Sequence, residues 1–226
     1  MALHAGGVVS KRTCIIANSP EFDSDGVLRH VATADCIIAA DGAVAQLPSG
    51  VTPHIVCGDF DSHERDTYRC RYPSTEWIEV SDQDTNDLEK CIALALARGA
   101  SEVSIVCGWG GRLDQALTTL SVMERYHGVV PIVLHHGAWS CRRLSGNEGL
   151  SAVTLDARCG DRVSVIPQTS SVTVSLTNVR WPLTREVVLP GSRGVSNEAL
   201  GGEVEIVVHS GAALMCHESR LIAMPS

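Results

Sequence analysis

The sequence predicts an α/β domain with a mostly parallel sheet, followed by a smaller all-β sandwich or barrel. Up to about residue 135, short apolar runs alternate with helical patterns, as buried parallel strands and their crossover helices do. After about residue 140 the apolar runs are short, rich in Val and Thr, and punctuated by Gly and Pro, and no long helical pattern remains. We therefore expect two domains, at residues 1–138 and 139–226.

The clearest single element is a helix over residues 86–98. Asn86 is a good N-cap with Glu89 three residues later, and Gly99 follows the last apolar position of the stripe. The other helices expected in the first domain cover 25–31, 42–47, 63–70 and 112–126. The expected strands are 12–17, 36–40, 54–57, 76–80, 103–107 and 129–134 in the first domain, then 163–166, 172–176, 187–189, 204–208 and 212–216, with the domain boundary near 137–149.

Charge is distributed unevenly along the chain. Residues 1–128 hold 18 acidic and 10 basic side chains, a net charge of −8, whereas residues 129–226 hold eight of each. An acidic chain without a basic stripe is a poor nucleic-acid binder, so we expect no nucleic-acid partner. No apolar run approaches the roughly 18 residues of a membrane span, and no secretory signal is evident, so we expect a cytoplasmic protein without a membrane partner.

Cysteine and histidine give no metal signature. The nine cysteines include no C-x-x-C pair and several fall inside apolar runs, which favours small buried side chains in a reducing compartment. The only adjacent histidine pair, His135-His136, lacks the spacing of a metal motif, and we expect it on the surface or in a loop.

Two acidic clusters directly follow predicted strands. Asp41 and Gly42 come after strand 36–40, where an ordinary turn is the simpler interpretation. Asp59 and Asp61 follow strand 54–57 two residues apart, so an extended backbone would direct both carboxylates to one point, as a magnesium site requires. The alternative is that Asp61 or Ser62 simply caps the next helix.

Two further clusters follow later strands. Asp87 and Lys90 share one face at the start of helix 86–98, where a lysine is favoured if an anion binds; an exposed ion pair is the alternative. The glycine-rich segment 108–111 precedes Arg112 and a helix, which suits a phosphate, although a flexible turn would serve the same sequence. It is not a P-loop, because neither lysine follows a G-x-x-x-x-G pattern.

Ligands of open α/β sheets bind beyond the carboxyl ends of the strands. Because all four clusters fall at such ends, we expect carboxylates, a lysine, an arginine and a glycine turn at one edge of one sheet. This set predicts phosphoryl or nucleotidyl transfer on a magnesium-nucleotide.

The order of these motifs resembles the thiamine pyrophosphokinase family. The motifs are Asp41-Gly42, Gly58-Asp59-Phe60-Asp61-Ser62, Gln83-Asp84-x-x-Asp87-x-x-Lys90 and Gly111-Arg112-x-Asp114-Gln115, followed by Val165-Ile166-Pro167, Asn178-Val179-Arg180-Trp181-Pro182-Leu183 and Gly194-Val195-Ser196-Asn197. The resemblance covers roughly residues 12–215, and the aspartate-rich motifs are its specific part.

The resemblance implies an activity and roles for the residues. The family transfers the pyrophosphoryl group of ATP to the hydroxyl of thiamine, requires Mg²⁺, and forms homodimers with sites at the subunit interface. The catalytic residues implied are Asp59, Asp61, Asp87, Lys90, Arg112 and Asp114, with Asp59, Asp61 and Asp87 as the metal ligands. The ATP contacts implied are Asp41, Gly42, Ser62, Gly111, Arg112 and Gln115, and the thiamine contacts are Gln83, Trp181, Ser196 and Asn197, with Trp181 stacking on the cationic substrate.

Two other functions remain open at this stage. One is a pyrophosphokinase that acts on another hydroxymethyl heterocycle, such as a pterin, because the catalytic aspartates suit either substrate. The other is a thiamine-binding protein without catalysis, which should lack part of the acidic and basic set.

Overall fold

The computed structural model describes residues 11–60 and 65–219, so the predicted site residues Asp61 and Ser62 lie outside the described residues. The first region contains β1 (Arg12–Ile16), α1 (Ser24–Val31), β2 (Cys36–Ala40), the 3-10 helix η1 (Asp41–Gln46), β3 (Ile55–Gly58), α2 (Arg65–Arg71), β4 (Glu76–Glu79), α3 (Asp87–Ala97), β5 (Glu102–Val106), α4 (Leu113–Arg125) and β6 (Ile132–His136). The second contains β7 (Trp139–Ser145), β8 (Ala152–Ala157), β9 (Arg162–Pro167), β10 (Val172–Leu176), β11 (Leu183–Val188), β12 (Asn197–Glu198), β13 (Gly202–Ser210) and β14 (Ala212–Glu218).

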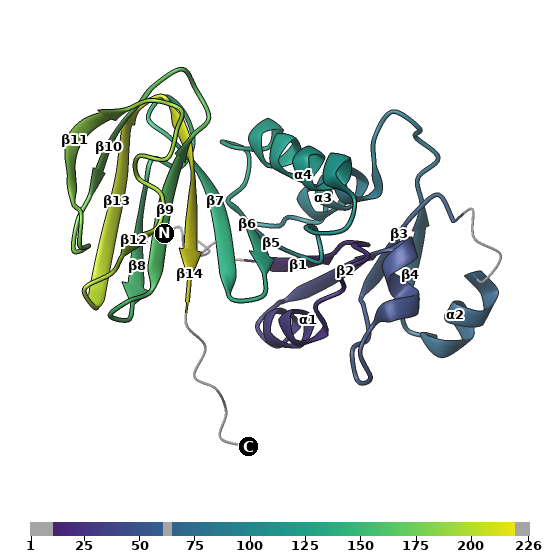
Figure 1. The fold of residues 1–226 in the computed structure, drawn as a ribbon. Coiled ribbons are helices and arrows are strands. Elements are labelled where there is room, and N and C mark those ends of the chain that lie inside the picture. The colour runs from purple at the N-terminus through teal and green to yellow at the C-terminus, as the bar shows by residue number, and fades with distance from the viewer. Residues whose placement is uncertain (1–10, 61–64, 220–226) are drawn as a thin grey trace, which may run out of the picture.

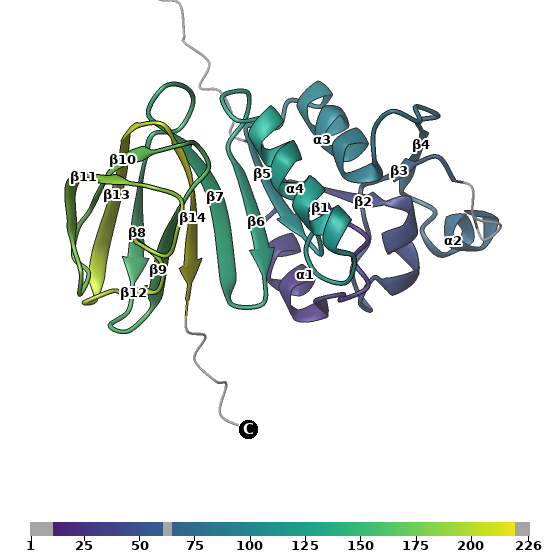
Figure 2. The same ribbon diagram turned by 45° about the horizontal axis from the view of Figure 1, so that its top comes forward.

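The first region is a parallel sheet covered by helices on both faces. Its strands lie in the order β6-β5-β1-β2-β3-β4, and every neighbouring pair is parallel. Helices α3 and α4 lie on one face, and α1 lies on the other (Figures 1 and 2). The chain proceeds outward from β1 to β4 on one side and then returns to place β5 on the other side of β1. The strand order therefore reverses between β1 and β5, which is where open α/β sheets form their binding crevice.

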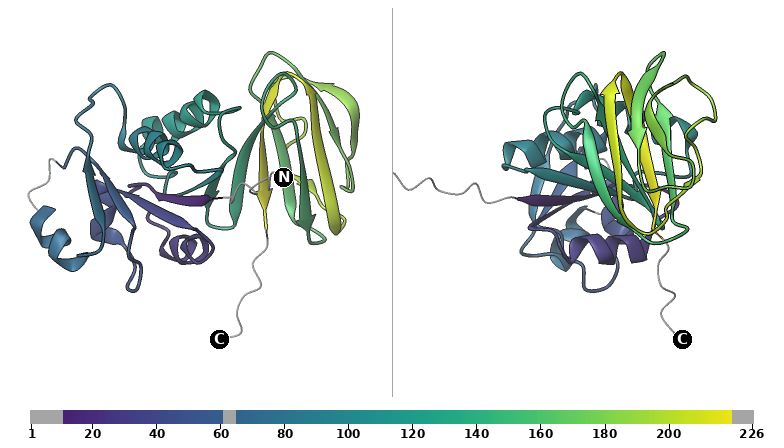
Figure 3. Two further views of the ribbon diagram at one scale, coloured as in Figure 1. Left: turned by 180° about the vertical axis from the view of Figure 1, so that it is seen from behind. Right: turned by 90° about the vertical axis from the view of Figure 1, so that its left-hand side faces the viewer.

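The second region is an antiparallel sandwich, as the sequence predicts. The first sheet continues through β7, β14, β9 and β12, and a separate sheet of order β11-β10-β13-β8 packs against this extension (Figure 3). Burial alternates along β10, so that Val172, Val174 and Leu176 enter the sandwich core while the residues between them stay partly exposed. The chain thus has two hydrophobic cores, although one sheet passes continuously from the first region into the second.

Several elements differ from the sequence prediction. The expected strand 129–134 begins only at Ile132, because residues 126–130 form a turn in which Val129 is 64% exposed. The helix expected at 42–47 is a 3-10 helix, and the strand expected at 187–189 is the end of β11. Strands β7, β8 and β12 have no counterpart in the prediction; β7 crosses the segment expected to hold the boundary, since its polar residues conceal the strand pattern.

The histidine pair is also placed differently from the expectation. His135 and His136 lie at the end of β6 and are partly buried, and the ring of His135 stacks on that of His30 with the centroids 3.7 Å apart. All nine cysteines are free thiols, and Cys141 and Cys216 lie opposite each other on β7 and β14. Over the residues that the structure describes, no helix has both the length and the apolar character needed to cross a membrane.

Candidate active site

A cavity of about 490 Å³ opens at the carboxyl ends of the parallel strands. Its wall comes from the last residue of β2, from the segments after β1, β3, β4 and β5, and from the first turns of α3 and α4. Figure 1 shows where these elements lie in the sheet. The lining residues are Ala17, Asn18, Ser19, Pro20, Ala40, Asp59, Gln83, Thr85, Asn86, Asp87, Leu88, Lys90, Cys107, Gly108, Gly110, Arg112, Gln115, Ala116 and Thr119. The structure therefore brings three of the four predicted strand-end clusters into one cavity wall, as the sheet topology requires.

A buried lysine lies at the base of this cavity. Asn86 caps α3 by accepting a hydrogen bond from the Glu89 N–H at 2.9 Å, and this cap places Asp87 and Lys90 in the first turn. The Lys90 side chain is 3% exposed, and its Nζ lies 3.3 Å from Asp87 Oδ1 and 3.8 Å from Asp59 Oδ2. Burial opposes the charge of Lys90, but the hydrogen bond to Asp87 and the surrounding carboxylates outweigh it and raise the pKa.

Asp41 shapes the turn that carries Asp59. Its carboxylate accepts hydrogen bonds from the N–H groups of Gly42 at 2.6 Å and Phe60 at 2.9 Å. Residue 58 must be glycine here, because a Cβ would lie 2.3 Å from Asp41 Cγ. Burial, assisted by the charges of Asp87 and Asp59, raises the pKa of Asp41 despite these two donors. Asp41 and Gly42, predicted as ATP contacts, are absent from the lining of the described cavity; Asp41 instead holds the backbone next to Asp59.

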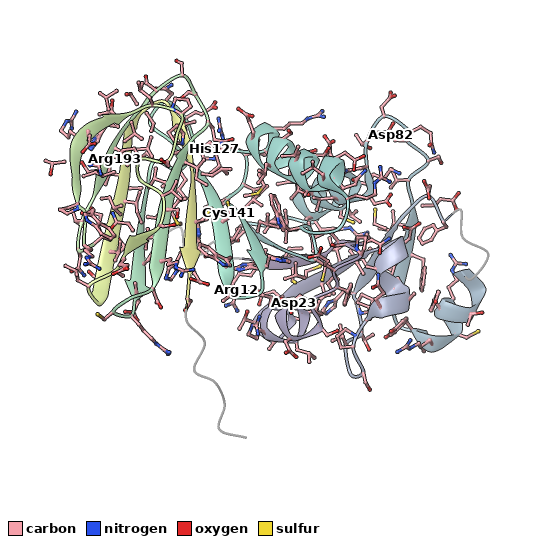
Figure 4. All side chains as sticks on the ribbon, in the orientation of Figure 1. Arg12, Asp23, Asp82, His127, Cys141 and Arg193 are labelled. Atoms are coloured by element: carbon pink, nitrogen blue, oxygen red, sulfur yellow. The ribbon has the colours of Figure 1, made fainter. Side chains whose placement is uncertain are left out.

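The loop after β4 contributes Gln83 and Thr85 to the cavity wall. Asp82 orders this loop by accepting hydrogen bonds from the Asp84 N–H at 2.9 Å and from Thr85 Oγ1 at 2.7 Å. Figure 4 shows Asp82 on the loop that rises beside α3, away from the sheet. The predicted residue Gln83 is thus presented to the cavity by a turn whose own polar groups are satisfied.

The glycine turn and the start of α4 form the opposite wall. Gly108 and Gly110 line the cavity, whereas Gly111 is not among the lining residues. Arg112 makes a two-bond ion pair with Asp114, with Nη2–Oδ2 2.6 Å and Nε–Oδ1 3.1 Å. The hydrogen bond from Arg112, assisted by the Gln115 N–H, lowers the pKa of Asp114. Both side chains are about two-thirds exposed, so the guanidinium can exchange this carboxylate for another oxyanion at little cost.

The loop after β1 was missed by the sequence reasoning. Asn18, Ser19 and Pro20 line the cavity, and the Glu21 carboxylate accepts a hydrogen bond from the Gly111 N–H at 3.0 Å. Glu21 receives no role from the sequence alone, because nothing near it in the chain suggests a site. Its position just after a buried apolar strand was the available signal, since the segments after β3, β4 and β5 at the same edge also contribute to the cavity.

The carboxylates of the described residues are suitable ligands for a hard divalent cation, but they do not form a complete set of metal ligands by themselves. Among residues 11–60 and 65–219, no three His, Cys, Asp or Glu side chains stand together as a ready metal site. Asp59 and Asp87 nevertheless face one cavity, and their charges contribute to the raised pKa of Asp41. A divalent cation bound with phosphate oxygens would relieve this repulsion, and Mg²⁺ normally uses only one or two protein carboxylates in such sites.

The predicted thiamine contacts of the second region lie apart from this cavity. Asn197 is 3% exposed; its side chain accepts a hydrogen bond from the Trp181 N–H at 3.0 Å and donates one to the Trp181 carbonyl at 2.6 Å. Ser196 is exposed, and its N–H donates to Ser164 Oγ at 2.9 Å. The Trp181 ring is exposed at the surface, with the Arg180 guanidinium 4.8 Å from its centroid. Asn197 therefore holds the backbone of the Trp181 loop, and its amide is already bonded.

Comparison with known proteins agrees with this arrangement. Residues 27–134 match the family model described as thiamin pyrophosphokinase, catalytic domain, and residues 152–213 match the thiamin pyrophosphokinase, vitamin B1 binding domain. The thiamin pyrophosphokinase 1 of Caenorhabditis elegans is 31% identical over 101 residues. That alignment covers 39% of this chain and 40% of the worm protein, so it spans less than half of that relative.

Solved structures of this kind share the fold. The thiamine pyrophosphokinase of Bacillus subtilis superimposes with a TM-score of 0.79 at 22% identity, over 93% of this chain and 100% of that one. The thiamin pyrophosphokinase of Geobacillus thermodenitrificans gives 0.76 at 24% identity, over 94% and 100%. The yeast thiamin pyrophosphokinase gives 0.74 at 14% identity, over 93% and 86%. With both family models matched in order along the chain, this protein belongs to the thiamin pyrophosphokinase family.

Proposed function

We propose that this protein is a thiamine pyrophosphokinase, which transfers the pyrophosphoryl group of ATP to the hydroxyl of thiamine and releases AMP. The observation that carries the proposal is the convergence of Asp59, Asp87, Lys90 and Arg112 with the glycine turn on one cavity, in a chain of this family. Those groups supply the charge neutralisation and positioning on which phosphoryl transfer depends.

The cationic groups would bind the polyphosphate. Lys90 is buried, charged and held by two carboxylates, so it presents a fixed positive charge at the cavity base. Arg112 would exchange Asp114 for phosphate oxygens, because a guanidinium binds both oxyanions with the same two-bond geometry. The start of α4 adds the partial positive charge of a helix N-terminus on the same side.

Asp59 and Asp87, together with Asp61, would hold Mg²⁺ against the phosphates. When bound, this ion would neutralise charge on the triphosphate and hold its oxygens in a defined orientation. Asp59 or Asp87 would also accept the proton of the substrate hydroxyl. That hydroxyl oxygen attacks the β-phosphorus, a new P–O bond forms, and the bond between the β-phosphorus and the bridging oxygen to the α-phosphate breaks, so that AMP leaves with the bridging oxygen.

Thiamine recognition would use Gln83 from one chain and the Trp181 surface of a second copy. Gln83 already lines the cavity, whereas within residues 11–60 and 65–219 the cavity lining includes no residue beyond Thr119. The Trp181 face, which already carries the Arg180 guanidinium, suits the cationic ring of thiamine. Leu113 and Leu117, which are 73% and 53% exposed on α4 beside the cavity, support a homodimer that covers this face.

Two broader assignments belong to the same proposal. A functional division of the chain at residue 138 is supported by the two separate hydrophobic cores, one on each side of the β6–β7 hairpin. A cytoplasmic location is supported by nine cysteines that are all free thiols.

The proposal is tested by incubating the protein with ATP, MgCl₂ and thiamine and separating the products. We expect AMP and thiamine diphosphate in equal amounts, and neither product after addition of EDTA. A parallel reaction contains 6-hydroxymethylpterin in place of thiamine. AMP formed only with the pterin, or thiamine binding without AMP, would contradict the assignment.

A further inference from the structure

Two loops far apart in the sequence meet where the strand order of the sheet reverses. Residues 18–21 follow β1, and the glycine turn, residues 108–111, follows β5; the Ala17 N–H donates to the Val106 carbonyl at 2.9 Å just before the two loops begin. Both loops line the proposed nucleotide cavity. Their contact therefore sets the shape of the crevice in which α/β sheets of this kind bind ligands.

Ser19 makes the central contact between these loops. Its hydroxyl donates to the Trp109 carbonyl at 2.7 Å, with the Gly110 carbonyl at 3.3 Å, and its oxygen accepts the Glu21 N–H at 3.2 Å. The residue is 6% exposed, so water has little access to replace the hydroxyl. A carbonyl left without its donor in such a place costs more free energy than the same loss at the surface.

The neighbouring residues show how closely the two loops fit. Gly110 has a φ of 98°, and a Cβ there would lie 2.7 Å from Glu21 Oε2. Gly111 has a φ of 69°, and a Cβ there would lie 2.7 Å from Pro20 Cγ. The left-handed backbone of the glycine turn thus packs directly on the loop after β1.

We propose that Ser19 is a positioning residue for nucleotide binding. Its buried hydroxyl fixes the glycine turn, and thereby the direction in which the turn and the first residues of α4 face the phosphates. This inference rests on the proposed function, because it assigns the phosphates to that wall of the cavity. Glu21 differs from Ser19, since its carboxylate is exposed and a phosphate oxygen can take over the Gly111 N–H.

We expect the loss of the Ser19 hydroxyl to weaken the binding of the nucleotide and not that of thiamine. Without the hydroxyl, the glycine turn samples several conformations, and binding ATP must then order it. Ser19→Ala should raise the KM for ATP and the dissociation constant of α,β-methylene-ATP, whose α–β linkage resists transfer, roughly tenfold. The KM for thiamine should stay close to that of the natural chain.

Three variants separate this role from a general loss of structure. Ser19→Thr keeps the hydroxyl and should restore most of the affinity that Ser19→Ala loses. Ser121→Ala removes a serine from the exposed surface of α4, where the hydroxyl bonds the Leu117 carbonyl at 3.4 Å, and should behave as the natural chain. Hydrogen–deuterium exchange should be faster over residues 107–113 in Ser19→Ala, with little change elsewhere.

Binding and turnover are measured separately, so the two proposals can fail separately. If the wild-type protein binds α,β-methylene-ATP but forms no AMP with thiamine, the proposed function is contradicted and the role of Ser19 is not. The role of Ser19 would be overturned if Ser19→Ala kept the wild-type affinity for α,β-methylene-ATP, the wild-type KM for ATP and the wild-type rate of hydrogen–deuterium exchange. If Ser19→Ala does not fold, Ser19→Cys, whose thiol is a weaker donor, replaces it. Wild-type affinity of Ser19→Cys for α,β-methylene-ATP would likewise overturn the role of Ser19.

Discussion

Both regions of the molecule bury charged side chains, and Lys90 and Asp161 show how a charge in the candidate site differs from one that serves the fold. The Lys90 side chain in the α/β region is 3% exposed and borders a cavity of about 490 Å³ together with Asp59 and Asp87. Asp161 in the sandwich is 1% exposed, accepts the Arg158 N–H at 2.9 Å, and lies 3.5 Å from His217 Nε2. Burial of charge by itself therefore does not identify a functional site; at Lys90 it coincides with a cavity and with two carboxylates at the strand ends.

The largest expected effect comes from removing the charge of Lys90, which is buried but borders the cavity. Lys90→Ala should lower kcat/KM for ATP by at least about 100-fold, because Asp59, Asp87 and the phosphates lose their fixed cation. Lys11→Ala is the matched control, since Lys11 is the only other lysine and its Nζ bonds the Arg98 carbonyl on the surface. Steady-state kinetics at saturating thiamine measure the effect. Equal activity of the two variants would remove Lys90 from the proposed mechanism.

Removal of the buried Asp161 carboxylate should affect stability rather than activity. Asp161→Ala removes the buried carboxylate that accepts the Arg158 N–H and lies beside His217, so we expect the free energy of unfolding to fall by about 3 kcal/mol. Asp156→Ala removes the only other aspartate of residues 129–226, which is exposed on β8, and should change stability by less than about 0.5 kcal/mol. Urea unfolding measures both. A structural role for Asp161 would be contradicted if Asp161→Ala keeps its stability but has a lower turnover number per folded molecule.

Asn197 and Trp181 separate structural from ligand roles within the sandwich. Asn197→Ala removes both bonds to the Trp181 backbone and should lower the free energy of unfolding by about 2 kcal/mol. Trp181→Ala removes a ring that is 47% exposed, so it should leave stability nearly unchanged and raise the KM for thiamine roughly tenfold. Thermal unfolding and kinetics on both variants distinguish these outcomes. Trp181→Ala with an unchanged KM for thiamine would argue against the stacking role.

The smallest expected effect is a pH dependence of stability that comes from His135, near the end of β6. Burial, with the charges of His30, Arg142 and Arg29, lowers the pKa of His135 to about 3. Between pH 6.5 and 3 the unfolded chain binds a proton at this position and the folded chain does not, so stability falls as pH falls below 6.5. The slope is on the order of 1 kcal/mol per pH unit. In His135→Gln this component should disappear from urea unfolding at pH 5.5 against pH 7.5; an unchanged slope would exclude His135.

The sequence predicted most of the α/β region because its signals are local. Apolar runs, the Asn86 cap and turn residues after each strand depend on neighbours in the chain, and the strand-end rule then places Asp59, Asp87, Lys90 and Arg112 at one edge. The mixed composition of β7 and β8 lacks such a pattern, since their partners β14 and β13 supply the burial from 45 or more residues away.

The sequence by itself determined the fold class, the family and the edge of the sheet where the cavity lies. Only the tertiary structure decided that Ser19 and Glu21 hold the glycine turn, that the Asn197 amide is bonded to the Trp181 loop, and that His135 stacks on His30. Hydrophobic periodicity and helix capping act over a few residues and leave a readable pattern. A hydrogen bond between loops 90 residues apart leaves none, because its geometry exists only after the sheet has brought both strands together.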